Sequence, residues 1–128
     1  MVIDSSALIA LLLGEPEAQS FAQKIAADNR RLLSSVNALE TAIVLEAKKG
    51  TAGSREYDLL LYKTDIQIIP FTRQHYKAAR SAWLVYGKGR HPARLNMGDC
   101  CAYALSKQTG ESLLFKGDDF AQTDVLRA

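Results

Sequence analysis

Acidic side chains follow two of the short apolar segments that we expect to be strands. Asp4 comes directly after the apolar residues 2–3, and Asp118 and Asp119 follow the apolar segment 112–115. In open α/β sheets, sites lie beyond the carboxyl ends of the parallel strands, which meet at one edge. We therefore expect these carboxylates to gather at that edge, although a single Asp after a strand is as often a turn residue or helix cap.

Glu40 is an acid on what we predict to be the buried face of a helix. A rotation of about 100° per residue places Glu40 in the middle of an apolar stripe and turns Leu45 away from it. A carboxylate on a buried stripe is rare unless it is paired or binds a metal ion. The alternatives are a Glu at the rim of the core or a salt bridge to an Arg. The stripe consists of Val36, Leu39, Ile43, Val44 and Ala47.

Asp99 stands at the start of a further predicted helix, residues 99–108. Taken alone, it is explained at least as well by a capping or first-turn role as by function, and the helix dipole keeps it ionised in either role. Clustered carboxylates are the ligands that hard divalent cations such as Mg²⁺ prefer. Cleavage of a phosphodiester without a protein nucleophile needs an activated water, and such an ion supplies one.

The charge is distributed unevenly, although the net charge of the chain is only +2. The segment 66–98 contains Lys and Arg but no Asp or Glu, and it leads directly to Asp99. A basic segment beside an acidic site suits a polyanion held over metal-binding carboxylates, although a solvated helix face would explain part of the pattern. The candidates for RNA binding in this segment are Arg80, Lys88, Arg90 and Arg94.

Apolar segments alternate with helical patterns along the whole chain, which predicts an α/β fold with a parallel sheet covered by helices on both faces. The 128 residues, 48% hydrophobic and 23% charged, suit a single globular domain over 1–128 and exclude a disordered or collagen-like chain. The expected strands are 2–3, 31–34, 66–69 and 112–115, and the expected helices are 7–13, 15–28, 35–49, 54–64, 72–86 and 99–108.

Neither a membrane span nor a signal peptide is expected. The longest apolar run, residues 7–13, is far shorter than the roughly 20 residues that a span needs, and the start of the chain lacks the basic region of a signal peptide. The adjacent Cys100 and Cys101 suit neither a disulfide nor a zinc site, so we expect two reduced thiols on a helix of a cytoplasmic protein.

Four strings occur in the order and at the spacing of one known family: MVIDSSALIALLLGEPEA, SSVNALETAIVLEAKKG, YGKGRHPARLNMGDCCAYALSK and LLFKGDDFAQTDV. In these strings the chain resembles the PIN-domain ribonucleases, and more closely the VapC toxins of VapBC toxin–antitoxin systems. The resemblance covers essentially the whole chain and implies a PIN-like three-layer sandwich. It also implies a toxin that cleaves RNA with Mg²⁺ or Mn²⁺ until a cognate VapB-type antitoxin blocks the site.

Matched position by position, the resemblance implies that Asp4 and Asp99 hold the metal ion directly or through water. Glu40 and Asp119 would complete the shell or position the attacking water. An antitoxin of this family would reach the acidic groove with a basic residue and pack an apolar helix nearby. The catalytic residues implied are Asp4, Glu40, Asp99 and Asp119, with Ser6 supporting the first.

The identity of the fourth acid stays open, because Asp118 and Asp124 flank Asp119. Phe120 is the expected apolar anchor of this turn and would fix the orientation of the residue before it. Asp119 is therefore our candidate, Asp118 would cap the turn or face the solvent, and Asp124 would brace the segment.

The alternative function is a non-enzymatic binding or signalling module with an acidic pocket. A dehalogenase-type phosphatase needs an acid two residues after Asp4, where Ser6 stands, and a receiver domain needs an Asp after a middle strand, where 66–72 has none. Retention of four candidate acids argues against a catalytically dead binding module. We also expect a homodimer, because Leu45 and Trp83 would leave apolar surface for a partner.

Overall fold

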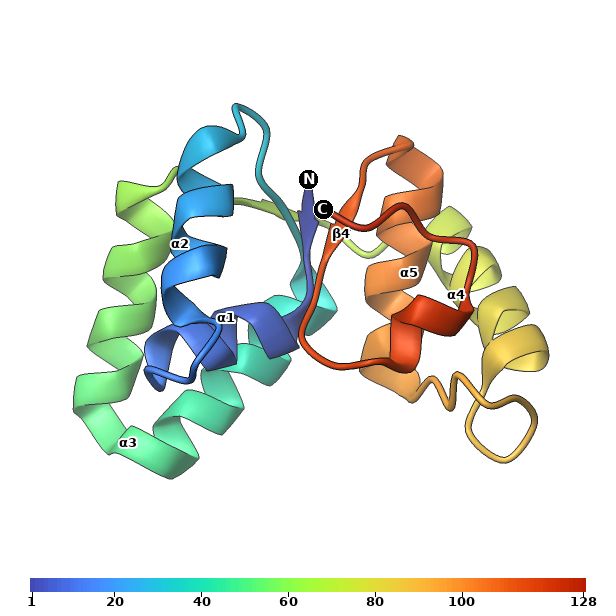
Figure 1. Ribbon diagram of the computed structural model, residues 1–128, viewed down its shortest axis with the longest axis horizontal. Coiled ribbons are helices and arrows are strands. Elements are labelled where there is room, and N and C mark those ends of the chain that lie inside the picture. Colours follow the sequence, from blue (N-terminus) through green and yellow to red (C-terminus); the bar gives the residue numbers. More distant parts are fainter.

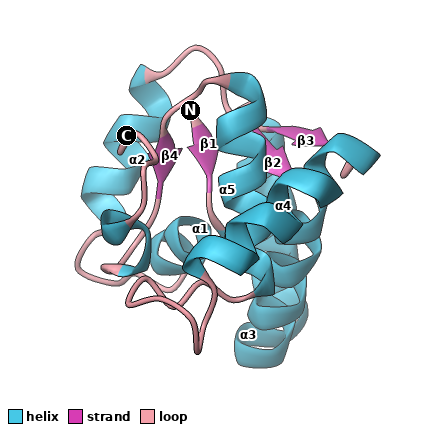
Figure 2. Ribbon diagram, turned by 90° about the vertical axis from the view of Figure 1, so that its right-hand side faces the viewer, coloured by secondary structure: helices cyan, strands magenta, loops and turns pink.

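All four strands of the sheet run parallel, in the order β3-β2-β1-β4, in the computed structural model, which describes residues 1–128. β1 lies between β2 and β4 (Figure 2). Since the first and last strands are neighbours, the residues that follow them meet at one edge. The strands are β1 (Val2–Ile3), β2 (Leu32–Ser34), β3 (Gln67–Ile69) and β4 (Leu113–Leu114).

Helices cover both faces of the sheet, which confirms the predicted three-layer α/β fold (Figure 1). One layer contains α1 (Ser5–Leu12), α2 (Ala18–Ala27) and α3 (Ser35–Lys63), and the other contains α4 (Arg73–Tyr86) and α5 (Met97–Thr109). A 3₁₀ helix, η1 (Asp119–Gln122), follows β4 and was not expected from the sequence. No helix is long and apolar enough to span a membrane.

Successive residues of each strand point into two separate hydrophobic cores. Val2 and Leu113 pack with α4 and α5, whereas their neighbours Ile3 and Leu114 pack with α1 and α3. This alternation follows from the two-residue period of a strand. The apolar strands are therefore explained by burial on both faces, and only β3, at the edge, is largely exposed.

Several predicted helix boundaries differ from the structure, and two of the differences have a clear physical reason. The loop expected between 49 and 54 is absent: Gly50 adopts φ 61° and ψ −151°, which kinks α3, and the helix resumes at once. A positive φ with this ψ is accessible to glycine alone. The helix expected to begin at Asp99 begins two residues earlier at Met97, because Asn96 is its N-cap.

The face of α3 that we predicted to be buried is exposed. Leu39 and Ile43 are 63% and 59% exposed, whereas Leu45, expected to face away, is fully buried. The buried face carries small and polar residues such as Asn37 and Thr41, whose side chains form hydrogen bonds in the interior. Small side chains let α3 pack closely against α1, so apolar periodicity alone indicated the wrong face.

We expect Leu45→Ala to lower the free energy of unfolding by about 3 kcal/mol, because it leaves a cavity in a closed core. Leu59→Ala is the matched control on the same helix, since Leu59 is 50% exposed, and it should cost about 0.5 kcal/mol. Urea denaturation of both variants measures the difference, and equal losses would contradict the assigned face.

Candidate active site

Asp4 caps α1 and also faces the acid edge of the sheet. Its side chain is buried, and its Oδ2 accepts hydrogen bonds from the Ser6 amide (3.0 Å) and the Ser6 hydroxyl (2.6 Å). Its Oδ1 accepts no hydrogen bond from the protein. The capping and functional interpretations of Asp4 are therefore compatible, because each uses a different oxygen.

Ser6 links the two loops that carry acids. Its hydroxyl donates to Asp4 and accepts a hydrogen bond of 3.0 Å from the backbone amide of Lys116, just after β4. The side chain of Lys116 pairs with Glu15 and Glu17. The first acid and the segment leading to Asp119 are thus held together through one hydroxyl.

Asp99 occupies the third position of α5 and forms a capping box with Asn96. Asp99 Oδ2 accepts from the Asn96 amide (3.0 Å), and Asn96 Oδ1 accepts from the Asp99 amide (2.9 Å). The Oδ1 atom of Asp99 accepts no hydrogen bond from the protein. Both acids therefore lie at helix N-termini, where the helix dipole favours negative charge.

Glu40, on α3, lies near Asp4 and Asp99. We call Asp4, Glu40, Asp99 and Asp119 the acid cluster. Glu40 Oε1 accepts a hydrogen bond of 2.5 Å from the hydroxyl of Ser5, and its Oε2 has no donor. The carboxylate lies against the backbone of Gly98, where an added Cβ would come within 2.7 Å of both oxygens. Glu40 is half-buried because it lies where three helices meet, and not because it belongs to a buried apolar stripe.

Sequence reasoning missed the groups that hold Glu40. Ser5 is not among the predicted site residues, and neither is Asn37, which donates to Ser5. Its only signal is local: Asn37 lies one helical turn before Glu40, on the same side of the helix. Hydrogen bonds between helices leave no periodic pattern that could have identified these residues.

Of the acids after β4, Asp119 is the one coupled to the cluster. Its charge is among the causes that raise the pKa of Asp99. Asp118 is exposed and makes no capping hydrogen bond, whereas Phe120 is buried with its ring 5.1 Å from that of Phe115. The expected anchor role of Phe120 is confirmed.

Asp124 points to a different part of the molecule. It accepts hydrogen bonds from the hydroxyl of Tyr103 (2.6 Å) and from Lys107 (2.9 Å). These bonds attach the last segment of the chain to α5, as expected for a bracing acid.

Burial and mutual repulsion shape the electrostatics of the cluster. Burial raises the pKa of Asp4 to about 7, the bonds from Ser6 lower it in part, and the charges of Asp99 and Glu40 raise it further. Burial likewise raises the pKa of Asp99 to about 6, opposed by the Asn96 amide and reinforced by Asp119 and Glu40. The neighbouring carboxylates are thus close enough to destabilise the ionised forms of Asp4 and Asp99.

The cluster contains no cation of its own. None of its four acids takes part in an ion pair, and no three acidic, His or Cys side chains are placed to enclose a metal ion. Carboxylates with free oxygens in an open arrangement suit a hard ion such as Mg²⁺, which keeps several of its waters. The residues therefore fit a hydrated divalent cation better than a closed structural metal site.

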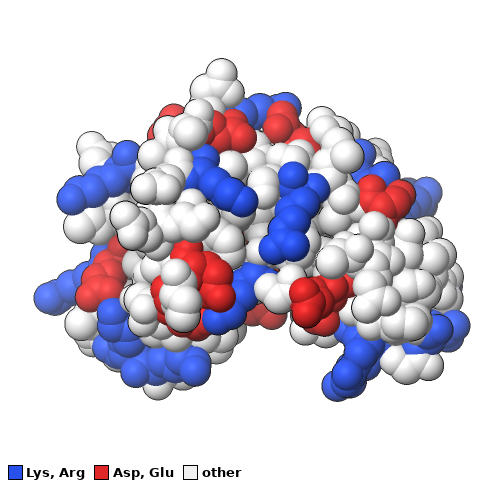
Figure 3. All heavy atoms as spheres, in the orientation of Figure 1, with Lys and Arg blue, Asp and Glu red and all other residues white.

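The four candidates for RNA binding are all exposed. Arg80 lies on α4, and Lys88, Arg90 and Arg94 lie on the loop that leads into α5, which is drawn at the lower right of Figure 1, below η1. The guanidinium of Arg90 stacks over the ring of Trp83, 4.4 Å from its centroid. Acidic and basic side chains are interspersed on the face drawn in Figure 3, so any attraction of RNA to this face is local.

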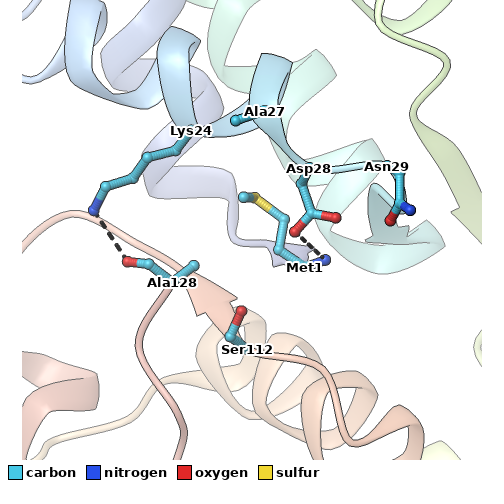
Figure 4. A pocket seen from close by; sticks show the side chains of 7 residues that line it. All are labelled: Met1, Lys24, Ala27, Asp28, Asn29, Ser112 and Ala128. Atoms are coloured by element: carbon cyan, nitrogen blue, oxygen red, sulfur yellow. Dashed lines mark hydrogen bonds and ion pairs between the residues drawn. The ribbon is translucent and has the colours of Figure 1, made fainter.

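A separate hollow of about 520 Å³ lies at the opposite edge of the sheet, where β1 and β4 begin. Figure 4 shows its lining: Asp28 bonds the amino group of Met1 (3.1 Å), and Lys24 bonds the carbonyl of Ala128 (3.1 Å). The charged side chains Asp28 and Lys24 thus already have hydrogen-bond partners, and Asp28 has a cationic one, which the acids of the cluster lack.

Comparisons with known proteins identify the family of this chain and agree with its fold. The chain is 49% identical over 125 residues to "Ribonuclease VapC30" of Mycobacterium tuberculosis, an alignment that covers 98% of this chain and 95% of the relative. Among solved structures, the M. tuberculosis toxin VapC20, described as cleaving the sarcin-ricin loop, superposes with a TM-score of 0.79 at 18% identity, covering 99% and 97% of the two chains. A toxin–antitoxin complex from Klebsiella pneumoniae gives 0.76 at 17% identity, covering 99% and 95%.

The structural neighbours show a shared fold, and the sequence comparisons show membership of a family. The sequence model of the PIN domain family matches residues 1–126, and the relative with 49% identity matches along nearly the whole chain. This chain belongs to the PIN domain family.

Proposed function

We propose that this protein is a metal-dependent endoribonuclease that acts as the toxin of a toxin–antitoxin pair. The observation that carries the proposal is the set of carboxylates at one sheet edge, each with a free oxygen and none with a cationic partner. The identity of 49% with a ribonuclease of the PIN family supports the same activity.

The roles follow from which oxygens are free. Asp4 and Asp99 would hold Mg²⁺ or Mn²⁺, directly or through water, and Glu40 and Asp119 would complete the shell or orient the attacking water. The ion, when bound, supplies a water of lowered pKa and neutralises charge at the phosphorus. The exposed cations Arg80, Lys88, Arg90 and Arg94 bind phosphates of the RNA backbone.

The proposed antitoxin binds the same carboxylates, whose negative charge has no cationic partner in the protein. A basic side chain, in particular a bidentate Arg, placed among the free carboxylate oxygens would satisfy them and exclude the metal ion. The toxin–antitoxin complex among the structural neighbours supports a partner of this kind. Because both RNA and the antitoxin are cytoplasmic in this scheme, we place the protein in the cytoplasm.

A second copy of the chain is the proposed partner for the exposed apolar surface on α3. Leu39, Ile43 and Met97 are 63%, 59% and 75% exposed, and they line or border an apolar hollow of about 240 Å³ beside Glu40. Trp83, 40% exposed, lines an adjoining apolar groove between α4 and α5. Apolar surface of this extent marks an interaction site.

Sedimentation equilibrium tests the homodimer. We expect the purified protein to be a dimer at micromolar concentration and Ile43→Glu to be monomeric, because it places a charge in the apolar contact. The variant should keep its circular dichroism spectrum, since Ile43 is exposed. A monomeric wild-type protein, or a dimeric variant, would contradict this surface.

Metal removal tests the enzymatic activity. Protein freed of antitoxin should cleave a structured RNA in Mg²⁺ or Mn²⁺ and lose this activity in EDTA. Asp99→Asn should reduce the cleavage rate by about 100-fold or more. Substituting a residue that only supports a metal ligand costs up to about 100-fold, and a direct ligand should cost at least as much. Its fold should persist, because the Asn side chain can still accept the capping hydrogen bond.

Undiminished cleavage in EDTA would overturn the carboxylate–metal mechanism. Binding of RNA without cleavage in any divalent ion would instead favour the non-enzymatic alternative. Unfolding of Asp99→Asn would make that residue a structural cap rather than a metal ligand.

The raised pKa values of Asp4 and Asp99 predict a pH dependence of stability. Their ordinary value is 3.8, and in the fold the pKa is about 7 for Asp4 and about 6 for Asp99. The folded state therefore binds more protons than the unfolded state between about pH 4 and 7, so the free energy of unfolding falls as pH rises through this range. Asp28, Glu111 and Asp124 have lowered pKa values and act in the opposite direction, because the stability they contribute is lost only as pH falls through and below their ordinary values of 3.8, 4.5 and 3.8.

Thermal unfolding in EDTA should accordingly give a higher Tm at pH 5 than at pH 7.5, and Asp4→Asn should reduce the difference. Added Mg²⁺ should raise Tm more at pH 7.5, where the carboxylates are ionised. A metal-free Tm that is equal at both pH values, or higher at pH 7.5, would contradict the raised pKa values of Asp4 and Asp99.

A further inference from the structure

The side chains of Ser5 and Asn37 join three helices directly beneath Glu40. The amide nitrogen of Asn37 donates to the Ser5 hydroxyl (3.2 Å) and to the backbone carbonyl of Gly98 (3.0 Å). The Ser5 hydroxyl lies 2.5 Å from Glu40 Oε1 and 3.3 Å from the carbonyl of Asn37. Ser5 and Asn37 are 4% and 0% exposed, so solvent does not compete for these bonds.

The direction of each hydrogen bond follows from its neighbour. The Gly98 carbonyl is only an acceptor, so it fixes the Asn37 carboxamide with its nitrogen towards Gly98 and Ser5. That nitrogen occupies a lone pair of the Ser5 oxygen, and the single hydroxyl hydrogen of Ser5 is directed to the nearer, charged acceptor, Glu40 Oε1. The series therefore runs from Gly98 through Asn37 and Ser5 to one oxygen of Glu40.

The backbone of Gly98 restricts the same carboxylate from the other side. A Cβ at Gly98 would lie 2.7 Å from both Glu40 oxygens, so the carboxylate occupies the space that a side chain would take. With Oε1 bound to Ser5 and the group packed against Gly98, only Oε2 is available to the acid cluster.

We infer that Ser5 and Asn37 are positioning residues that make Glu40 act through its Oε2 alone. The inference rests on the proposed function, because it assigns the geometry by which Glu40 serves the metal site. Without the Ser5 hydroxyl, the carboxylate loses its only protein donor and can rotate, which exchanges its two oxygens. Without Asn37, the hydroxyl can turn to the carbonyl of residue 37 instead.

Calorimetric titration of EDTA-treated protein with Mn²⁺, together with RNA cleavage, tests this inference. We expect Ser5→Ala and Asn37→Ala to weaken Mn²⁺ binding and to slow cleavage by roughly 10- to 100-fold each, the range for groups that orient metal ligands. Ser106→Ala is the matched control: it removes a buried hydroxyl that bonds a carbonyl (2.6 Å) on α5 and should bind Mn²⁺ like the wild type.

A double-mutant cycle separates positioning from a general structural effect. Since Ser5 acts through Glu40, adding Ser5→Ala to Glu40→Gln should cause no further loss of Mn²⁺ affinity or cleavage, whereas independent effects would multiply. The same cycle is measured on unfolding in EDTA, where the effects of the two substitutions should again be less than additive.

The outcomes distinguish the inference from the proposed function. Multiplying losses, wild-type Mn²⁺ affinity of Ser5→Ala, or an unfolded Ser5→Ala would each overturn the positioning role. If Asn37→Ala fails to fold, the Ser5 cycle alone decides. A wild-type protein that binds Mn²⁺ without cleaving RNA would refute the ribonuclease and leave the inference standing. If it binds no Mn²⁺, the metal site fails, and a non-additive unfolding cycle still supports the coupling of Ser5 to Glu40.

Discussion

Burial of neighbouring carboxylates without a cationic partner is the constraint on which the active edge depends. Burial raises the cost of ionising Asp4 and Asp99, nearby carboxylates add repulsion to it, and the fold supplies no cation to offset it. What it supplies instead is donors to a single oxygen of three of the acids: the amide and hydroxyl of Ser6 for Asp4, the Asn96 amide for Asp99 and the Ser5 hydroxyl for Glu40. These donors fix the orientation of the acids and leave their second oxygens unsatisfied. That residual deficit is what a divalent ion, or a basic residue of an antitoxin, can satisfy.

The short strands serve this arrangement by bringing the acid-bearing loops together. β1 and β4 pair directly, so the residues after them begin from adjacent positions. The amide of Lys116 then bonds Ser6, and Phe120 packs into the core beside Phe115. Both ends of the segment that carries Asp119 are therefore anchored. An exposed acid such as Asp119 keeps its place through these neighbours rather than through contacts of its own.

The sequence was sufficient for the strands, the layers and the acids that follow strands, because these depend on local patterns. Val2–Ile3 followed by Asp4 is such a pattern, and so is the apolar strand before Asp119. It was not sufficient for the orientation of α3, because Leu39 and Ile43 form as good an apolar stripe as the residues that are buried. The buried face has Asn37 and Thr41 within it, and their burial depends on hydrogen bonds. The partners of Asn37 lie on other helices, so the sequence of α3 alone does not indicate them.

Glu40 shows why the erroneous face of α3 and the predicted site role of this residue are compatible. The residue lies at the boundary between the buried and exposed faces of α3, with Ser5 and Gly98 on its inner side and the apolar residues Val36 and Ile43 around its outer side. A boundary position lets one carboxylate take part in the interior hydrogen bonds and still contact a surface hollow. The proposed second copy, seated on that surface, would shield the outer side of Glu40 from water and strengthen its interactions on the inner side. Catalytic geometry and association would then be coupled through a single side chain, because the helix that presents Glu40 to the acids presents its apolar neighbours to the partner.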